Sequence, residues 1–372
     1  MENFKPYLVL VGQFIHSRDA NRPSTLKESC PMQNLVVLQK KIVPELIQVL
    51  ERRYNILRAI YFSQPVGRRV LATKLGMGER LARSDIGALK DQGLLTADTV
   101  GMWVTSEGES LLGSLDELMH QVKGLGTLER ELAHLLNIQR VLIVPGDLDE
   151  DDTVKKELGR AAARYFRQII KPRMVVAITG GTTTLEVAQA MTQSPGSEEL
   201  VVVPARGGLG EEVEIQANVI AAQLAQKLGG SYRLLHVPDN LSKEALEVLS
   251  SEPGIQAVLS QIQQANIVVH GIGCAEEMAN RRGVSPGKVA ELLGKGAVGE
   301  AMGSYFNREG LEVEATGGLG LPVHDLTRVS TVIAVAGGSG KWEAIKAVVA
   351  NRPQQVLVTD EGAARAILRP TN

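Results

Sequence analysis

Hydrophobic and polar residues alternate along the first third of the chain with the period of an α-helix. Residues 35–62 carry apolar side chains at helical spacing, at Ile47, Leu50, Tyr54, Leu57 and Ile60. Proline at the first turn of a helix costs little hydrogen bonding, so we expect Pro44 to open a fresh helix there. Residues 107–137 repeat the helical pattern with a break at 124–126, where the glycines predict a hinge.

The stretch between these two helical regions has the element order of a winged helix-turn-helix. The predicted elements are a helix at 68–75, a turn at 76–78, a helix at 79–92 that ends at Gly93, and two short strands within 94–105. Helix, turn, helix and β-hairpin in this order is a DNA-binding arrangement.

From residue 141 the pattern changes to short apolar runs separated by amphipathic helices. The predicted strands are 141–145, 174–179, 200–205, 232–238, 267–273, 330–338 and 355–360. Near-continuous Val and Ile runs alternating with helices are typical of a parallel sheet covered on both faces. The sequence therefore predicts an α/β fold, a doubly wound Rossmann-like domain preceded by the winged helix-turn-helix.

These patterns predict four segments along the chain. They are a poorly ordered extension (1–31), the winged helix-turn-helix domain (32–106), a helical linker (107–125) and the α/β domain (126–372). Met32 is a plausible alternative start, because the clean helical pattern begins just after it.

Composition narrows the class of protein. A length of 372 residues fits two or three domains, and 44% apolar with only 3% aromatic residues suits an α/β protein. The two cysteines, Cys30 and Cys274, allow no disulfide framework, and the scattered histidines form no local metal motif, which suits a cytoplasmic protein. We expect no signal peptide and, without an apolar run of eighteen residues, no membrane span.

The net charge of −2 gives no overall nucleic-acid signature, but the helix-turn-helix is locally basic. Between residues 61 and 95, three acidic residues (Glu79, Asp85 and Asp91) stand against six basic ones. The basic residues are Arg68, Arg69, Lys74, Arg80, Arg83 and Lys90. Arg80, Arg83, Ser84 and Lys90 fall on or beside the predicted recognition helix, where arginine reads guanine and lysine holds phosphate. The alternative is an ordinary solvated face of a helical bundle, and the predicted wing favours DNA binding.

Glycine-rich and cationic loops follow several predicted strands, which is where parallel sheets bind ligands. These loops carry Gly180, Gly181, Thr182, Thr183 and Thr184, then Arg206, then Arg281 and Arg282, then Lys341. Free amides and hydroxyls at a helix start favour an anion such as phosphate. A Walker A loop is excluded by Val335 and Trp342, and a GxGxxG loop by Glu343.

Purely structural roles could also explain the residues assigned to this anion site. Glycines after strands are common turn residues, and the two adjacent arginines could merely be solvated. His270 and Cys274 border a buried strand and are expected to be core residues. Glu300 follows Gly299 at an expected helix start, where a carboxylate is favourable without any ligand.

Four segments together resemble the SorC-type sugar-binding transcriptional regulators. They are residues 39–95, VAITGGTTTLEVAQAM (176–191), VVPARGGLGEEVEIQANVIA (202–221) and VAGGSGKWEAI (335–345). The resemblance covers residue 32 to the C-terminus. It implies a non-enzymatic repressor of lower-glycolysis genes that binds double-stranded operator DNA, assembles as dimers and tetramers, and is released by fructose 1,6-bisphosphate. That sugar acts as an effector, and no cofactor is implied.

The resemblance also implies roles for individual residues. The effector-binding positions that match the family are Gly180, Gly181, Thr182, Thr183, Arg206, Gln216, Glu300, Lys341 and one of Arg281 or Arg282. Loops with Arg206 and Lys341 after different strands suit two phosphates, and Gln216 suits a sugar hydroxyl.

Three alternatives remain open at this point. The chain could be a sugar-phosphate isomerase or deaminase, with a general base among Asp147, Glu211, Glu212, Glu300 and Asp325. It could be a repressor that senses a monophosphate sugar. It could also be a constitutive DNA-binding protein whose α/β domain only oligomerises.

Overall fold

The computed structural model describes residues 42–193, 199–208, 212–238, 241–350, 352 and 355–369. Contacts divide the chain into two units, residues 1–47 and 48–372. The predicted extension, Met32, Cys30, Glu211 and the helical pattern before residue 42 lie outside the described residues.

The helix-turn-helix prediction is confirmed to within a residue or two. Its elements are α2 (Pro44–Ser63), α3 (Arg68–Lys74), α4 (Glu79–Asp91), β1 (Leu95–Ala97) and β2 (Met102–Val104), with β1 and β2 paired antiparallel. Pro44 opens α2 as expected. Gly93 follows α4 with φ +75°, a left-handed conformation that ends a helix with little strain when the residue is glycine.

An ion-pair cluster fastens α4 to α2. The carboxylate of Asp85, with a side chain only 3% exposed, accepts hydrogen bonds from Arg52 and from Arg53, the latter at 3.1 Å. Burial opposes ionisation of Asp85, but these hydrogen bonds outweigh it and lower its pKa. The negative charge of Asp85 is therefore balanced by the two arginines of α2. It does not reduce the positive charge on the exposed face of α4.

Two helices lead into the α/β part of the chain. They are α5 (Ser106–Val122) and α6 (Leu125–Leu136), separated at Gly124, where φ is +67°. The Thr105 hydroxyl accepts from the Gly108 amide at 3.1 Å and caps α5 directly after the wing. The predicted break is confirmed, and Lys123 beside it pairs with Glu361 at 2.9 Å.

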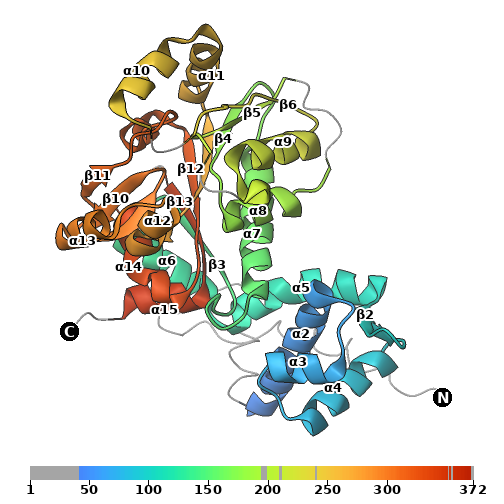
Figure 1. Ribbon diagram of the computed structural model, residues 1–372. Coiled ribbons are helices and arrows are strands. Elements are labelled where there is room, and N and C mark those ends of the chain that lie inside the picture. Colours follow the sequence, from blue (N-terminus) through green and yellow to red (C-terminus); the bar gives the residue numbers. More distant parts are fainter. Residues whose placement is uncertain are drawn as a thin grey trace, which may run out of the picture. The chain divides into compact units, whose positions relative to one another are not determined.

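A seven-stranded parallel sheet forms the centre of the α/β part (Figure 1). Its strands are β3 (Arg140–Val144), β4 (Val175–Ile178), β5 (Val201–Pro204), β6 (Ser231–Tyr232), β7 (Ile267–Gly271), β12 (Thr331–Val335) and β13 (Gln355–Asp360). The spatial order is β3-β13-β12-β7-β4-β5-β6. The order reverses between β4 and β7, and in doubly wound sheets such a reversal marks the ligand crevice.

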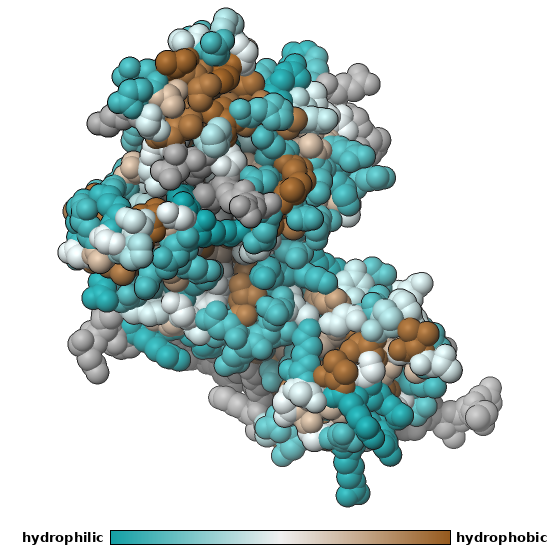
Figure 2. All heavy atoms as spheres, viewed as in Figure 1, coloured by the Kyte–Doolittle hydropathy of each residue, from teal (hydrophilic) through white to brown (hydrophobic). Residues whose placement is uncertain are grey.

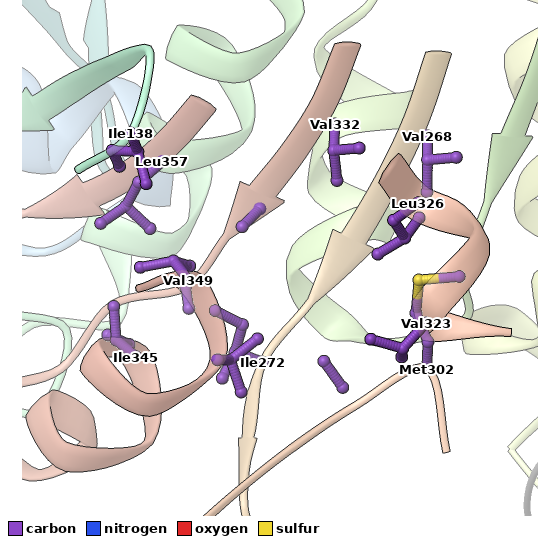
Figure 3. Packing of buried hydrophobic residues seen from close by; sticks show 14 of the residues in the cluster. Ile138, Val268, Ile272, Met302, Val323, Leu326, Val332, Ile345, Val349 and Leu357 are labelled. Atoms are coloured by element: carbon purple, nitrogen blue, oxygen red, sulfur yellow. The ribbon is translucent and has the colours of Figure 1, made fainter. Parts of the chain in front are cut away.

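Helices cover both faces of this sheet, as the continuous apolar runs predict. Along β12 the side chains alternate between two hydrophobic cores, one on each face of the sheet. Ile333 and Val335 belong to the first core, and Val332 and Ala334 belong to the second. The first face carries α7 (Thr153–Ile169), α8 (Thr182–Ala190) and α9 (Ala217–Leu228). The second carries α6, α11 (Pro253–Gln263), α14 (Trp342–Val349) and α15 (Glu361–Leu368), and Figure 3 shows part of its core around Val332 and Leu357.

The structure adds elements that the sequence pattern did not predict. They are α10 (Lys243–Ser251), α12 (Ala275–Arg281), α13 (Pro286–Gly294), the 3-10 turns η1 (Val213–Ile215), η2 (Val323–Arg328) and η3 (Ser339–Lys341), and the strands β8 (Gly273–Cys274), β9 (Ala297–Ala301), β10 (Ser304–Asn307) and β11 (Glu312–Ala315). The four strands make a separate sheet in the order β11-β10-β9-β8. Glu300 therefore lies in β9, and its expected place at a helix start is wrong, because β9 pairs antiparallel with β10.

The predicted strand 232–238 is also largely wrong. Only Ser231–Tyr232 pairs with β5, although Leu235 and Val237 are buried as a strand would bury them. The backbone of Leu235 bonds instead to the Asn218 side chain of α9, with its amide at 2.9 Å and its carbonyl at 3.0 Å. The Asn218 side chain therefore takes the backbone hydrogen bonds of Leu235 that a neighbouring strand would otherwise make. Among the described helices, none is long and apolar enough to cross a membrane.

Candidate functional site

A cavity of about 450 Å³ opens where β4 and β7 end, and it brings all ten predicted effector residues together. Its walls include Gly180, Gly181, Thr182, Thr183, Arg206, Gln216, Arg281, Arg282, Glu300 and Lys341. The volume lies in the range that holds a small ligand. Parallel strands end at a common edge, so loops distant in sequence meet here.

The start of α8 forms one wall through close backbone packing. A Cβ at Gly180 would lie 2.6 Å from the Ile215 carbonyl oxygen, and Gly181 has φ +132°. Only glycine fits both positions, and the pair brings the exposed Thr182 and the first amides of α8 to the cavity. The first amides of a helix lack partners within the helix and attract anions.

The next two threonines hold this helix start in place. The Thr183 hydroxyl donates to the Val335 carbonyl at 3.1 Å, which joins α8 to the end of β12. The buried Thr184 hydroxyl donates to the Gly181 carbonyl at 3.0 Å. Thr183 thus lines the cavity as predicted, but its hydroxyl proton is already engaged by the fold.

Arg206 reaches from the loop after β5 to the second sheet. Its guanidinium donates to the Met302 carbonyl and to the Thr316 hydroxyl, the latter at 3.2 Å. It packs over Gly303, where φ is +81° and a side chain would collide with it. Gln216 stands at the start of α9 beside the same loop. Two different elements therefore orient the predicted arginine and glutamine.

The structure separates the two adjacent arginines at the end of α12. The Arg282 side chain is 4% exposed, and it donates to Glu300 at 2.8 Å and to the Tyr305 hydroxyl at 3.3 Å. Glu300 also accepts from the Gly303 amide at 2.6 Å. Arg281 is one-third exposed, and its ion pair with the exposed Glu212 is longer, at 3.8 Å.

Lys341 lies at the start of α14, on the loop after β12. Its ammonium group is 3.9 Å from the exposed Glu277 carboxylate, and its side chain is 31% exposed. Cationic side chains at a helix start oppose the helix dipole, so this one is better placed to meet an anion than to stabilise α14.

The cavity also contains residues that the sequence analysis missed. They include Leu148, Asp149 and Asp152 from the segment after β3, Lys155 in the first turn of α7, and Glu277 on α12. The rule that ligands bind after strands applies to β3 as well, and its loop carries no glycine-rich signal to attract notice. In total, five cationic and four acidic side chains line the cavity.

The predicted DNA-binding residues are exposed on the helix-turn-helix. Arg80, Arg83, Ser84 and Lys90 lie on α4, whose buried positions are Ala82, Asp85, Ile86 and Leu89. Arg68 and Arg69 are exposed at the start of α3, and Arg69 is 3.8 Å from Glu79 at the surface. One face of α4 therefore packs inward while its basic face is open to solvent.

His270 is a core residue, as expected. It is buried in β7, its Nδ1 lies 3.0 Å from the Gly271 carbonyl, and its Nε2 lies 2.9 Å from the Gln355 amide nitrogen. Burial lowers its pKa to about 4, so the ring is neutral and serves packing.

Two family models cover most of the chain. The CggR N-terminal DNA binding domain matches residues 49–119, and the "Putative sugar-binding domain" matches residues 120–369. A DNA-binding domain joined to a sugar-binding domain defines a transcriptional regulator.

Similar proteins agree with this class. The chain is 44% identical to the central glycolytic genes regulator of Priestia megaterium, over 92% of this chain and 100% of the relative. The same identity extends over 91% of this chain and 99% of the Bacillus subtilis regulator of that name. A crystal structure of "the putative SorC family transcriptional regulator from Enterococcus faecalis" is 40% identical with a TM-score of 0.61, over 65% of this chain and all of that one.

The fold extends to more distant proteins. The full-length sorbitol operon regulator SorC from Klebsiella pneumoniae is 16% identical and has a TM-score of 0.62 over 92% of this chain and all of that one. The chain belongs to the SorC-type family of sugar-binding transcriptional regulators, and the relatives it matches at 44% identity are glycolytic gene regulators.

Proposed function

We propose that this chain is a repressor of glycolytic genes and that fructose 1,6-bisphosphate, bound in the cavity, releases it from operator DNA. The cavity carries this proposal, because it joins a helix start with two cationic loops around one space. The amides of α8 suit one phosphate, and Lys341 with its loop suits another. A monophosphate sugar would leave one of these two groups without an anion.

Arg281 is the better candidate of the two arginines for contact with the effector. Its side chain is one-third exposed and, among the described residues, its ion pair is the long one with Glu212, whereas the Arg282 side chain is buried against Glu300. We infer that Arg282 and Glu300 shape the cavity wall and that Arg281 meets the ligand. An arginine suits phosphate because its planar fork donates two parallel hydrogen bonds.

The carboxylates near the cavity support a sensor more than an enzyme. Glu300 is held by Arg282 and the Gly303 amide. Burial opposes ionisation of Asp147, but hydrogen bonds from Ser339 and the Asp149 amide hold its pKa below the ordinary value. A general base works best with a pKa near the working pH, and the lowered pKa of Asp147 does not meet that requirement.

We also propose that the regulator assembles as a dimer or tetramer. Figure 2 shows an apolar area over α10 and α11, where Val248 is 63% exposed. Large apolar surface areas commonly mark contact sites between proteins. Sedimentation velocity of the full chain, with and without fructose 1,6-bisphosphate, measures this assembly directly.

A thermal-shift titration of the full chain tests the effector. A ligand that binds only the folded state stabilises it by about 2.7 kcal/mol at a hundred times its Kd. We expect fructose 1,6-bisphosphate to raise the melting temperature more than fructose 6-phosphate, and Lys341→Ala to remove most of the rise. Lys346→Ala changes another lysine of the same helix, outside the cavity wall, and is expected to respond like the unaltered chain.

DNA release is the second half of the test. A duplex selected by the full chain from a random pool is labelled and followed by fluorescence anisotropy. Fructose 1,6-bisphosphate is expected to lower affinity for this duplex by about 5- to 150-fold, the usual range for coupled sites. Binding without release would refute the proposed control of transcription, and turnover of the sugar would favour an enzyme.

A further inference from the structure

Three successive amides of the loop between β12 and α14 are each hydrogen-bonded to an aspartate. The pairs are Gly338 with Asp360 at 2.7 Å, Ser339 with Asp147 at 3.0 Å and Gly340 with Asp149 at 2.6 Å. These amides belong to the loop of residues 336–341 (the β12–α14 loop), of which Ala336, Gly337 and Lys341 line the cavity. The backbone donors next to Lys341 are thus already bonded to carboxylates.

Asp360 is a structural partner of this loop. It is fully buried and also accepts hydrogen bonds from the amides of Leu148 and Ala363, both at 2.8 Å. These contacts tie the end of β13 to the two loops beside it. Removing such a group would disturb the fold, so Asp360 is not available to a ligand.

Asp149 differs because it is exposed and lies in the cavity wall. One carboxylate oxygen accepts from the Gly340 amide, and the other would lie 2.5 Å from a Cβ placed on Gly338, where φ is +103°. The carboxylate therefore sits directly against the loop backbone beside Lys341. It makes the kind of hydrogen bond that a phosphate oxygen would make at the same amide.

We propose that Asp149 is a built-in competitor for the phosphate that binds at Gly340 and Lys341, and that its displacement signals an occupied cavity to the DNA-binding domain. This inference rests on the proposed function. Two anions cannot share one amide donor at van der Waals distance without strong repulsion, so the carboxylate leaves when the phosphate arrives. The free energy spent on this displacement lowers the effector's affinity.

The signal has a short covalent route. Asp149 belongs to the segment 145–152 between β3 and α7, here called the β3–α7 loop, and Asp151 is two residues further along. Asp151 accepts from Arg58 of α2 at 3.3 Å and lies 3.9 Å from the Lys74 ammonium of α3. The Pro145 carbonyl of the same loop accepts from Arg58 at 3.4 Å.

Burial makes this contact sensitive to small movements. The Arg58 side chain is 6% exposed, and the nearby Glu157 carboxylate of α7 is 3.9 Å away. When a buried arginine loses its carboxylate partner, its charge stays uncompensated in the interior and the folded state is strongly destabilised. Movement of the β3–α7 loop therefore changes how α2 and α3 are held, and α2 holds the recognition helix α4 through Asp85.

Asp149→Asn tests the competitor. The substitution keeps the size of the side chain and removes its charge, so we expect fructose 1,6-bisphosphate to bind about fivefold more tightly or better by calorimetry at fixed ionic strength. Asp152→Asn is the matched control, since it removes the same charge from the same cavity without touching the hydrogen bond to Gly340. Equal tightening in both variants, or none in Asp149→Asn, overturns the competitor.

Inorganic phosphate, titrated in parallel, separates this inference from the proposed function. The bisphosphate could bind neither form while phosphate binds Asp149→Asn more tightly than the unaltered chain. That result would refute fructose 1,6-bisphosphate as the effector and support Asp149 as a competitor for phosphate. If phosphate binds both forms equally, the competitor is wrong whichever sugar is the effector.

Asp151→Asn tests the route to DNA. We expect the bisphosphate affinity to stay within about twofold while the ratio of duplex affinities without and with the sugar falls toward one. Lys74→Met weakens the same contact from the other side, and its effect on that ratio is expected to have the same direction. Full release in both variants would overturn the route through the β3–α7 loop.

Discussion

Glu157 gives the protein a pH-dependent stability that a single substitution removes. Its carboxylate is buried in α7 beside Arg58, and among the described residues its Oε1 has no hydrogen-bond partner. Burial raises its pKa from an ordinary value of 4.5 to about 7, Arg58 opposes the rise and Asp116 adds to it. Glu157→Gln keeps the shape and removes the titration.

The sign and size of the effect follow from proton linkage. Between pH 4.5 and 7 the folded state holds a proton that the unfolded chain has lost, so the free energy of unfolding falls as the pH rises through this window. The difference between 4.5 and about 7 corresponds to about 3 kcal/mol. Above pH 7 both states are ionised and the loss is complete.

Melting curves at pH 5, 6, 7 and 8 and fixed ionic strength measure this difference. At about 2–4 °C per kcal/mol, the unaltered chain is expected to lose about 5–10 °C more than Glu157→Gln between pH 5 and 8. Glu150→Gln, at an exposed position nearby, should follow the unaltered chain. Parallel pH profiles for the unaltered chain and Glu157→Gln would refute the assignment of the titration to Glu157.

Two further predictions concern packing and DNA. A Cβ at Gly159 would lie 2.6 Å from the backbone of Glu186, so Gly159→Ala is expected to push α7 from α8 and destabilise by about 1–3 kcal/mol in urea unfolding. Gly113→Ala, in an open part of α5, should instead stabilise by about 0.5–1 kcal/mol, and destabilisation of equal size in both would contradict the packing argument. Arg83→Ala is expected to weaken duplex binding and to reduce the slope of log affinity against log salt by about 0.9. Arg173→Ala, an exposed arginine of the α/β part, should leave that slope unchanged, and an unchanged slope in Arg83→Ala would place the DNA contact elsewhere.

Local patterns made much of the fold predictable. The helix-turn-helix follows from helical spacing and from glycines at turns, and six of the seven predicted strands lie within a few residues of their places. The ten effector positions meet in one cavity because parallel strands carry their following loops to one edge of the sheet.

Contacts between distant parts of the chain account for what the sequence missed. The segment 233–238 has strand-like burial, yet Asn218 takes the hydrogen bonds of Leu235 and the chain leaves the sheet. Glu300 became a strand residue because β9 pairs with β10 and because Arg282 neutralises it. Neither fact is visible in the residues next to Glu300.

The sequence by itself determined the order of elements and the residue types at the ends of strands, because hydrophobic periodicity and turn chemistry act over a few positions. Only the tertiary structure decided which charges are engaged. It buries the Arg282 side chain and leaves Arg281 partly exposed. It also places the Asp149 carboxylate where it accepts a hydrogen bond from the Gly340 amide, 191 residues away. Ion pairing and desolvation depend on distance in space, and the chain order does not encode that distance.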